Sequence, residues 1–326
     1  MRVALCGRFT EPWTAECDFR RTLQGLGHEV IPIPENLWNG RLKGEPWEPG
    51  RRRSAPVGWG DFELFAWVST YGWAPDNERM LAFLAECRER GVPTVAYHLD
   101  IWRGLRRAFQ VETLAHFRCQ YFFSGDGGSP EFWESRGINH RYLLPAVLED
   151  SCYLGAPDPR HDPEIVFIGS RQYHQEHPWR RRMLDYLERT YGPRFRIYEH
   201  SSGMRGERLS RLLVSARVTV GDSCFAGLLP GYTSDRLYES LGRGARLVYP
   251  EIAGVTDGAP CITHRPDDLG SLREAVELAL SDSPDEARAE RESAVAWTRS
   301  AHTYRHRWQE IFRVLRAEGA LIEEGR

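Results

Sequence analysis

Short apolar runs alternate with helical patterns along the first half of the chain. Strands are predicted at residues 3–6, 30–32, 64–68, 94–97, 121–124 and 141–144. Helices are predicted near 14–26, 77–90 and 130–136, and in a stretch after 101. Such alternation is typical of parallel strands joined by right-handed crossovers, so it predicts a doubly wound α/β sheet.

A second block with the same alternation follows residue 163. Its strands are predicted at 165–168, 196–198, 218–220 and 246–249, and its helices near 179–190, 207–215, 236–242 and 269–280. The segment 155–163 between the blocks holds three prolines, a composition typical of a stiff linker. A ligand cleft is expected between the facing carboxyl edges of the two sheets.

These patterns predict a first domain over 1–155 and a second over 156–300, both Rossmann-like. The charged helical segment 301–326 is expected to pack back on the first domain. Residues 35–60 are polar, rich in Pro, Gly, Trp and Arg, and show no period. A loop this long in a compact domain is expected to be functional or mobile.

Composition narrows the function classes. A hydrophobic content of 41 % with 27 % charged residues is that of a globular protein, and no apolar run reaches 18 residues. The N-terminal apolar run is too short for a signal peptide, and seven dispersed cysteines without Cys-x-x-Cys spacing favour reduced thiols over a zinc site. We therefore expect a cytoplasmic protein.

The net charge of −3 argues against a general nucleic-acid binder. Lys43 is the only lysine, so nearly every cation is an arginine. GC-rich coding is the simpler explanation, and phosphate binding by guanidinium groups is the functional one. Arginines cluster at 51–53, 103–107 and 180–182.

A short helix in the second block carries the most informative polar pair. Residues 233–235 are predicted to cap it, and Arg236 and Glu239 share one of its faces. The helix should end near 242–244, before a buried strand at 247–249. A cation and a carboxylate so placed suit a nucleoside diphosphate, with phosphate on the arginine and ribose hydroxyls on the glutamate. The alternative is a surface Arg–Glu pair on an ordinary helix.

The first strand of the second block ends in Gly169, Ser170 and Arg171. Glycine lets backbone N–H groups approach a phosphate, and the two following side chains can add donors. An ordinary strand-to-helix turn would have the same residues. The interpretation of this turn as a phosphate-binding loop therefore depends on the presence of Arg236 and Glu239 further along the chain.

The pattern Arg-x-Tyr-Glu-x-x-x-x-Gly before a strand resembles the nucleotide-sugar site of GT-B glycosyltransferases, in the CgeB-like and GT4-like branch. Residues 302–312 resemble the terminal helix of CgeB-like proteins. The resemblance implies two facing Rossmann-like domains with a cleft between them. It also implies metal-independent transfer of a sugar from an NDP-sugar, most readily a UDP-sugar, to an acceptor hydroxyl, with no further cofactor. The donor would contact Gly7, Gly169, Ser170, Arg171, Arg236, Tyr238 and Glu239.

Polar residues at strand ends of the first domain are candidates for catalysis. His98 stands where GT4-like enzymes often carry a histidine near the donor sugar, and Asp100 could accept the proton of an acceptor hydroxyl in an inverting reaction. Asp126 follows the next strand and is a further candidate. The structural alternatives are a strand-end histidine, a helix-capping Asp100 and an Asx-turn at Asp126.

One departure from the GT4 pattern leaves the stereochemistry open. GT4 enzymes commonly carry two glutamates eight positions apart, and Gly231 stands where the first would precede Glu239. Two other functions fit the sequence. One is a phage-type transferase acting on a hydroxymethylated base in duplex DNA, and the other is a catalytically silent binding or structural protein. The acceptor, whether glycan, small molecule or modified DNA base, is not named by the sequence.

Overall fold

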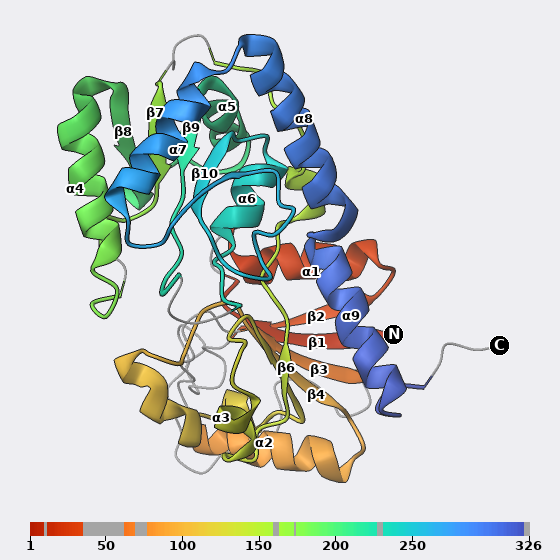
Figure 1. The fold of residues 1–326 in the computed structure, drawn as a ribbon. Helices are drawn as coiled ribbons and strands as arrows, with labels where there is room; N and C mark the ends of the chain where they lie inside the picture. Colours follow the sequence, from red (N-terminus) through yellow and green to blue (C-terminus); the bar gives the residue numbers. More distant parts are fainter. Residues whose placement is uncertain are drawn as a thin grey trace. The chain divides into compact units, whose positions relative to one another are not determined.

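The computed structural model describes residues 1–9, 12–34, 62–68, 77–158, 163–172, 174–226 and 231–322. The chain divides into two compact units, Met1–Leu143 with Arg305–Arg326, and Leu144–Tyr304 (Figure 1). The predicted proline segment lies within the second unit, and the whole of the predicted loop at 35–60 lies outside the described residues. Among the described helices, none has the length and apolar character needed to cross a membrane.

The first unit is built on a parallel sheet with the strand order β2-β1-β3-β4-β5-β6. Its strands are β1 (Arg2–Gly7), β2 (Glu29–Pro34), β3 (Leu64–Val68), β4 (Thr94–His98), β5 (Tyr121–Ser124) and β6 (His140–Tyr142). Its helices are α1 (Ala15–Gly25), α2 (Asn77–Glu89), α3 (Pro130–Glu134) and α9 (Tyr304–Ala317). The helix predicted after residue 101 consists instead of two 3-10 turns, η2 (Arg106–Glu112) and η3 (Ala115–Arg118).

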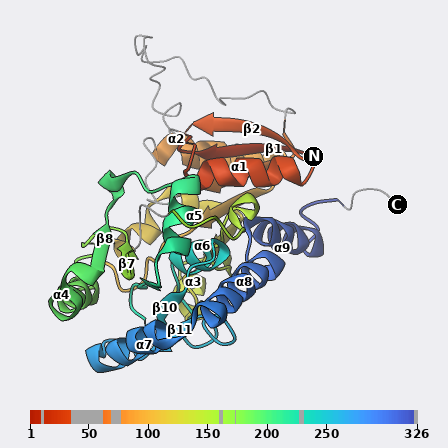
Figure 2. The same cartoon turned by 90° about the horizontal axis from the view of Figure 1, so that it is seen from above.

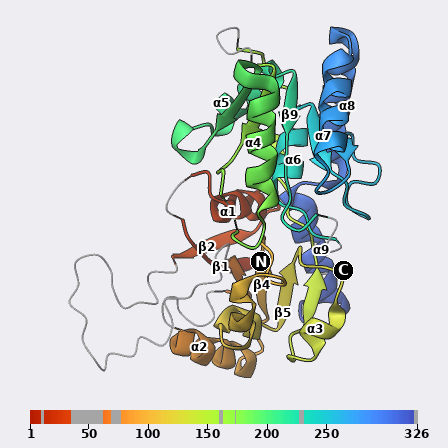
Figure 3. The ribbon, with the colours of Figure 1, turned by 60° about the vertical axis from the view of Figure 1, so that its left-hand side comes forward.

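Helices cover both faces of this sheet, with α1 and α9 on one side and α2 and α3 on the other (Figure 3). The ring of Phe19 on α1 stacks on Tyr97 of β4 at 5.3 Å and meets Trp308 of α9 edge-on at 5.8 Å. Trp67 and Phe122 belong to the core on the opposite face. Because β1 and β3 are buried on both faces, they appear in the sequence as continuous apolar runs, which predicted them.

The second unit is built on a parallel sheet with the order β11-β10-β9-β7-β8. Its strands are β7 (Ile165–Ile168), β8 (Phe195–Tyr198), β9 (Val218–Val220), β10 (Leu247–Pro250) and β11 (Ile262–His264). Its helices are α4 (Trp179–Tyr191), α5 (Gly206–Ser215), α6 (Arg236–Gly242), α7 (Leu269–Ser281) and α8 (Pro284–Ala301). Short 3-10 turns add η4 (Glu149–Ser151), η5 (Gly192–Arg194) and η6 (His200–Ser202).

This sheet also has a core on each face. α4 and α7 lie on one side of the strands and α5, α6 and α8 on the other (Figure 2). Phe167 and Val220 pack towards α4 and α7, whereas Leu247 and Tyr249 pack towards α6 and α8. The alternation of side chains along each strand therefore supplies both cores.

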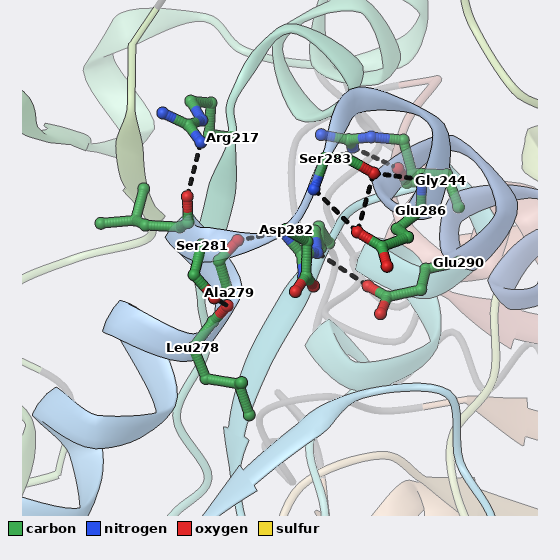
Figure 4. A network of polar contacts seen from close by, with 12 residues as sticks. Arg217, Gly244, Leu278, Ala279, Ser281, Asp282, Ser283, Glu286 and Glu290 are labelled. Carbon is green, nitrogen blue, oxygen red and sulfur yellow. Dashed lines mark hydrogen bonds and ion pairs between the residues drawn. The ribbon is translucent and has the colours of Figure 1, made fainter.

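Arginines close the amino-terminal edge of the second sheet (Figure 4). Arg246, directly before β10, donates Nε–H to Glu290 at 2.7 Å and pairs with Asp282. Arg217 donates to the carbonyl of Leu280 at 2.5 Å, and Arg291 donates to that of Gly244 at 2.7 Å. These cations satisfy carbonyls that the end of α7 and the neighbouring turn would otherwise leave unpaired. The polar groups at this edge are engaged in structural contacts. A ligand-binding site is therefore expected at the opposite, carboxyl edge of the sheet.

Candidate functional site

Arg236 is fixed at the carboxyl edge of the second sheet. It begins α6, and its guanidinium donates from Nε to the carbonyl of Ile168 at 3.1 Å and from Nη1 to that of Asp222 at 3.2 Å. Gly169 makes this approach possible, because a Cβ there would lie 2.8 Å from Nη2 of Arg236, and its φ of 141° is unfavourable for other residues. The sequence thus holds a cation where β7 and β9 end.

Asp222 lies beneath this arginine in a fully buried ion network. Its carboxylate accepts Nε–H of Arg180 at 2.8 Å and lies 3.4 Å from Nε2 of His177. Burial acts to raise the pKa of Asp222, but the His177 hydrogen bond and the Arg180 charge outweigh it and lower this pKa below its ordinary value. Asp222 is therefore an anion at neutral pH, held near the end of β9.

His177 connects this network to the backbone of the following loop. The N–H of Phe225 donates to Nδ1 of His177 at 3.3 Å, so Nδ1 carries no proton and, in the neutral ring, Nε2–H donates to Asp222. Phe225 has a φ of 56°, a left-handed conformation that costs free energy in a residue of its size. The histidine thus fixes a strained loop beside the carbonyl that holds Arg236.

The capping of α6 was predicted correctly in position but not in its hydrogen bonding. Asp235 is the N-cap but makes no side-chain capping hydrogen bond. The hydroxyls of Thr233 and Ser234 instead lie 2.9 and 3.4 Å from Oη of Tyr249, at the end of β10. A buried phenol needs polar partners, and this requirement takes precedence over local capping. The loop before α6 is consequently tied to the sheet.

Glu239 and Tyr238 lie on different sides of α6. Glu239 is partly exposed and accepts Nε–H of Arg243 on Oε2 at 2.8 Å. Tyr238 is buried, and its ring stacks on His302 at 5.1 Å. The helix therefore places Glu239, three residues after Arg236, on the same face as Arg236, and it places Tyr238 in the core.

The loop after β7 is turned towards α4. Arg171 forms ion pairs with Glu188 and, at 3.6 Å, with Asp185, both on α4. Ser170 donates its hydroxyl to the carbonyl of Gln172. The three residues predicted to bind phosphate therefore have different surroundings. Gly169 lies against Arg236, whereas the side chain of Ser170 binds within its own loop and that of Arg171 binds α4.

Asp126 is a structural anchor at the carboxyl edge of the first sheet. Its Oδ1 accepts Nε–H of Arg103 at 2.6 Å, and its Oδ2 accepts the backbone N–H groups of Trp102 and Arg103 at 3.0 and 2.8 Å. Arg103 also donates to Ser129 at 2.5 Å. Both oxygens of this buried carboxylate are engaged by residues distant in sequence. The hydrogen bonds therefore differ from those of the predicted Asx-turn alternative, which would be local.

Asp100 and His98 continue the end of β4. Asp100 accepts the N–H of Ile101 on Oδ1 at 2.8 Å and pairs through Oδ2 with Arg107 at 2.6 Å. His98 is buried beside the rings of Trp102 and His116, at 5.3 and 5.8 Å. The structure therefore gives Asp100 a cationic partner and puts His98 in an aromatic cluster.

Gly7 borders a buried carboxyl group that the sequence did not reveal. A Cβ on Gly7 would lie 3.2 Å from Cβ of Glu16, in the first turn of α1, and 3.2 Å from the carbonyl of Val68. Burial raises the pKa of Glu16, and hydrogen bonds from backbone N–H groups and from the Thr14 hydroxyl oppose this effect. Gly7 thus has a packing role at the end of β1.

Of the residues missed in the second unit, only Asp222 carries a signal in the sequence. Asp222 follows the predicted strand 218–220 after a single glycine, and polar residues at the carboxyl ends of parallel strands commonly face ligands. Its partners Arg180 and His177 lie 42 and 45 positions earlier, so no local pattern joins them. Among the described residues, no group of His, Cys, Asp and Glu has the arrangement of a metal site.

Part of the chain is similar in sequence to a known protein family. Residues 166–313 match the family model described as Glycosyl transferase-like. No curated protein matches the chain in sequence.

Solved structures match along nearly the whole chain. An alpha-glucosyltransferase in complex with UDP-glucose and DNA containing an abasic site is similar with a TM-score of 0.65 at 13 % identity, over 97 % of this chain and 99 % of that one. A UDP-forming trehalose-phosphate synthase from Burkholderia xenovorans gives 0.59 at 11 %, over 96 % and 98 %. An E. coli structure described as trehalose-6-phosphate bound with UDP-2-fluoro glucose gives 0.58 at 11 %, over 99 % of each chain. The chain therefore has the GT-B fold, and residues 166–313 are similar to the glycosyltransferase-like family.

Proposed function

We propose that this protein is a glycosyltransferase that takes its sugar from a UDP-sugar, with the donor bound at the carboxyl edge of the second sheet. The observation that carries the proposal is the placement of Arg236, whose guanidinium is held by the carbonyls of Ile168 and Asp222 against Gly169. A cation fixed at the ends of two parallel strands is suited to the charge that develops on a departing diphosphate.

UDP is the favoured carrier because similar structures contain UDP-glucose and UDP-2-fluoro glucose. Glu239 would accept the ribose hydroxyls, and Arg236 would contact phosphate. The first unit would hold the acceptor, near the end of β4. The seven cysteines are all free, in keeping with a reducing compartment, and we propose a cytoplasmic location.

The direct test is a screen of UDP-, GDP- and ADP-sugars for thermal stabilisation and for nucleotide release. We expect UDP and UDP-sugars to raise Tm most, and we expect UDP release to continue in EDTA because arginines carry the diphosphate charge. Stabilisation without release, across a panel of sugar and small-molecule acceptors, would favour the silent binding protein. Absence of any nucleotide effect would contradict the proposal.

Glu239→Ala is expected to weaken UDP binding by about 1–3 kcal/mol, because hydrogen bonds from ribose to a charged carboxylate are lost. Isothermal titration calorimetry measures this loss directly. Glu292→Ala is the matched control, since that glutamate pairs with Arg288 on the exposed face of α8. An unchanged UDP affinity in folded Glu239→Ala would remove Glu239 from the site.

Asp100→Asn is expected to keep turnover within about tenfold of the wild type. Both oxygens of Asp100 are already engaged, by Arg107 and by the Ile101 N–H, so it is poorly placed to take a further proton. Loss of a general base typically costs about 10²–10⁴ in rate. A loss of that size with normal UDP affinity would instead identify Asp100 as the base of an inverting reaction.

A modified base in duplex DNA is the second candidate acceptor. It is favoured by the similarity to an alpha-glucosyltransferase solved with DNA, at a TM-score of 0.65. Transfer of labelled glucose to hydroxymethylated duplex DNA would establish it, and DNA affinity should then fall steeply with salt. Transfer to sugars but not to such DNA would exclude it.

A further inference from the structure

Arg243 is a buried cation directly after α6 whose hydrogen bonds reach several elements. Its Nη1 donates to Oγ of Ser210 on α5 at 2.8 Å and to the carbonyl of Gly206 at 3.2 Å. Its Nη2 donates to Oγ of Ser151 on η4 at 2.9 Å. With 6 % of its surface exposed, this guanidinium has one well-defined position.

A further donor of this guanidinium, Nε–H, binds Glu239. Nε–H of Arg243 meets Oε2 at 2.8 Å, in the favourable order with the glutamate four residues before the cation on one helix. Oε1 has no partner in the described part of the chain, and the Glu239 side chain keeps 28 % exposure. The arginine thus holds one carboxylate oxygen and leaves the other open.

Such an arrangement restricts the rotamers of Glu239. A free glutamate side chain would lose conformational entropy on meeting a ligand, whereas one already held by a buried fork loses less. A side chain locked by supporting hydrogen bonds also discriminates more sharply between ligands that can and cannot satisfy it.

We propose that Arg243 is a positioning residue that presents Glu239 to the vicinal hydroxyls of the donor ribose and thereby sets discrimination between ribonucleotides and deoxyribonucleotides. This inference rests on the proposed function, since it requires a nucleoside diphosphate at Arg236 and Glu239. Arg243 is buried and gives four of its five N–H donors to Glu239, Ser151, Ser210 and Gly206, so it acts on the ligand through Glu239.

A purely structural role for Arg243 predicts a different result. If it only joins α5, α6 and η4, its loss should weaken all nucleotides alike. If it orients Glu239, its loss should weaken UDP much more than 2′,3′-dideoxy-UDP, which keeps the base and diphosphate but lacks the hydroxyls. The ratio of the two dissociation constants therefore separates the roles.

The experiment measures Kd for UDP and 2′,3′-dideoxy-UDP by calorimetry in the wild type, Arg243→Met, Arg243→Lys and Arg211→Met. Arg211→Met is the matched control, because Arg211 pairs with Glu207 across four residues on the exposed face of α5. We expect the wild type to prefer UDP by about 10–100-fold, as hydrogen bonds to a charged group allow. Arg243→Met should reduce this preference about tenfold, Arg243→Lys should restore part of it, and Arg211→Met should leave it unchanged.

The outcomes distinguish the inference from its premise. An unchanged preference in Arg243→Met, with both ligands weakened equally, would overturn the positioning role. Wild-type protein that binds UDP without preference would also overturn it while leaving the diphosphate site intact, and wild-type protein that binds neither ligand would overturn the proposed function as well. Should Arg243→Met not fold, Ser151→Ala removes one anchor of the fork and should lower the preference by a smaller factor; an unchanged preference there would count against the role.

Discussion

Replacing Asp222 by alanine is expected to lower the free energy of unfolding of the second unit by about 3–5 kcal/mol. The reason is the cation left behind. Arg180 is 2 % exposed and donates to this carboxylate at 2.8 Å, so the substitution leaves a buried guanidinium without its anion. His177 loses the same acceptor, and the Phe225 turn that it supports loses a fixed partner.

Because the chain has two units, this loss is best measured locally. Hydrogen exchange of the β7 and β9 amides should speed up in Asp222→Ala, and the urea midpoint should fall. The control is Glu207→Ala, which breaks an exposed pair on α5 and should change little. A second variant, Asp222→Ala with Arg180→Met, should recover stability, because the buried guanidinium that lacked an anion is then removed as well. Failure of that recovery would show that the cost does not come from the unpaired Arg180.

The same carboxylate gives stability a defined pH dependence. Its pKa in the folded protein is lower than the value of about 4 typical of an unfolded aspartate. The stabilisation is therefore present above about pH 4 and is lost as the pH falls through the lower folded value. In Asp222→Asn the contribution of this group to the acid limb should disappear, so that stability falls less steeply below pH 4.

The central strands were predictable because they are buried on both faces. Residues 64–68 and 165–168 are continuous apolar runs, 121–124 and 218–220 each include one serine or threonine, and the structure has strands with those bounds. β11 was not predicted, because its three residues include the exposed Thr263 and the polar His264 and make no apolar run. The stretch after residue 101 has apolar residues but forms 3-10 turns, since Asp126 and Arg103 fix its first residues from the side.

The candidate site was predictable only where its chemistry is local. Arg236 and Glu239 share a helix face at a spacing of three, which a sequence displays directly. The partners that fix them are distant in sequence: the carbonyl of Ile168 is 68 positions from Arg236, and Ser151 is 92 positions from Arg243. Capping was predicted from residues 233–235 alone, and the buried Tyr249 phenol recruited two of those side chains instead.

Arg236→Ala is expected to reduce kcat/KM for sugar transfer from a UDP-sugar by about 10²–10³, the cost of losing one fixed donor to developing charge. The magnitude follows from the position of the cation. Its guanidinium is held by two strand-end carbonyls and lies 5.5 Å from the centre of the Phe167 ring, so no reorganisation is needed as the diphosphate departs.

Arg236→Lys should recover little of this loss, because one ammonium group cannot span the carbonyls of Ile168 and Asp222 and still face a phosphate. Arg171→Lys should have a much smaller effect, since Arg171 is 38 % exposed and already paired with Asp185 and Glu188 on α4. Steady-state kinetics of UDP release measures both variants side by side. Equal losses in the two would place Arg171 on the diphosphate together with Arg236, and would require the loop after β7 to leave α4 when the donor binds. Normal kcat/KM in Arg236→Lys and Arg236→Ala would move the diphosphate site away from the ends of β7 and β9.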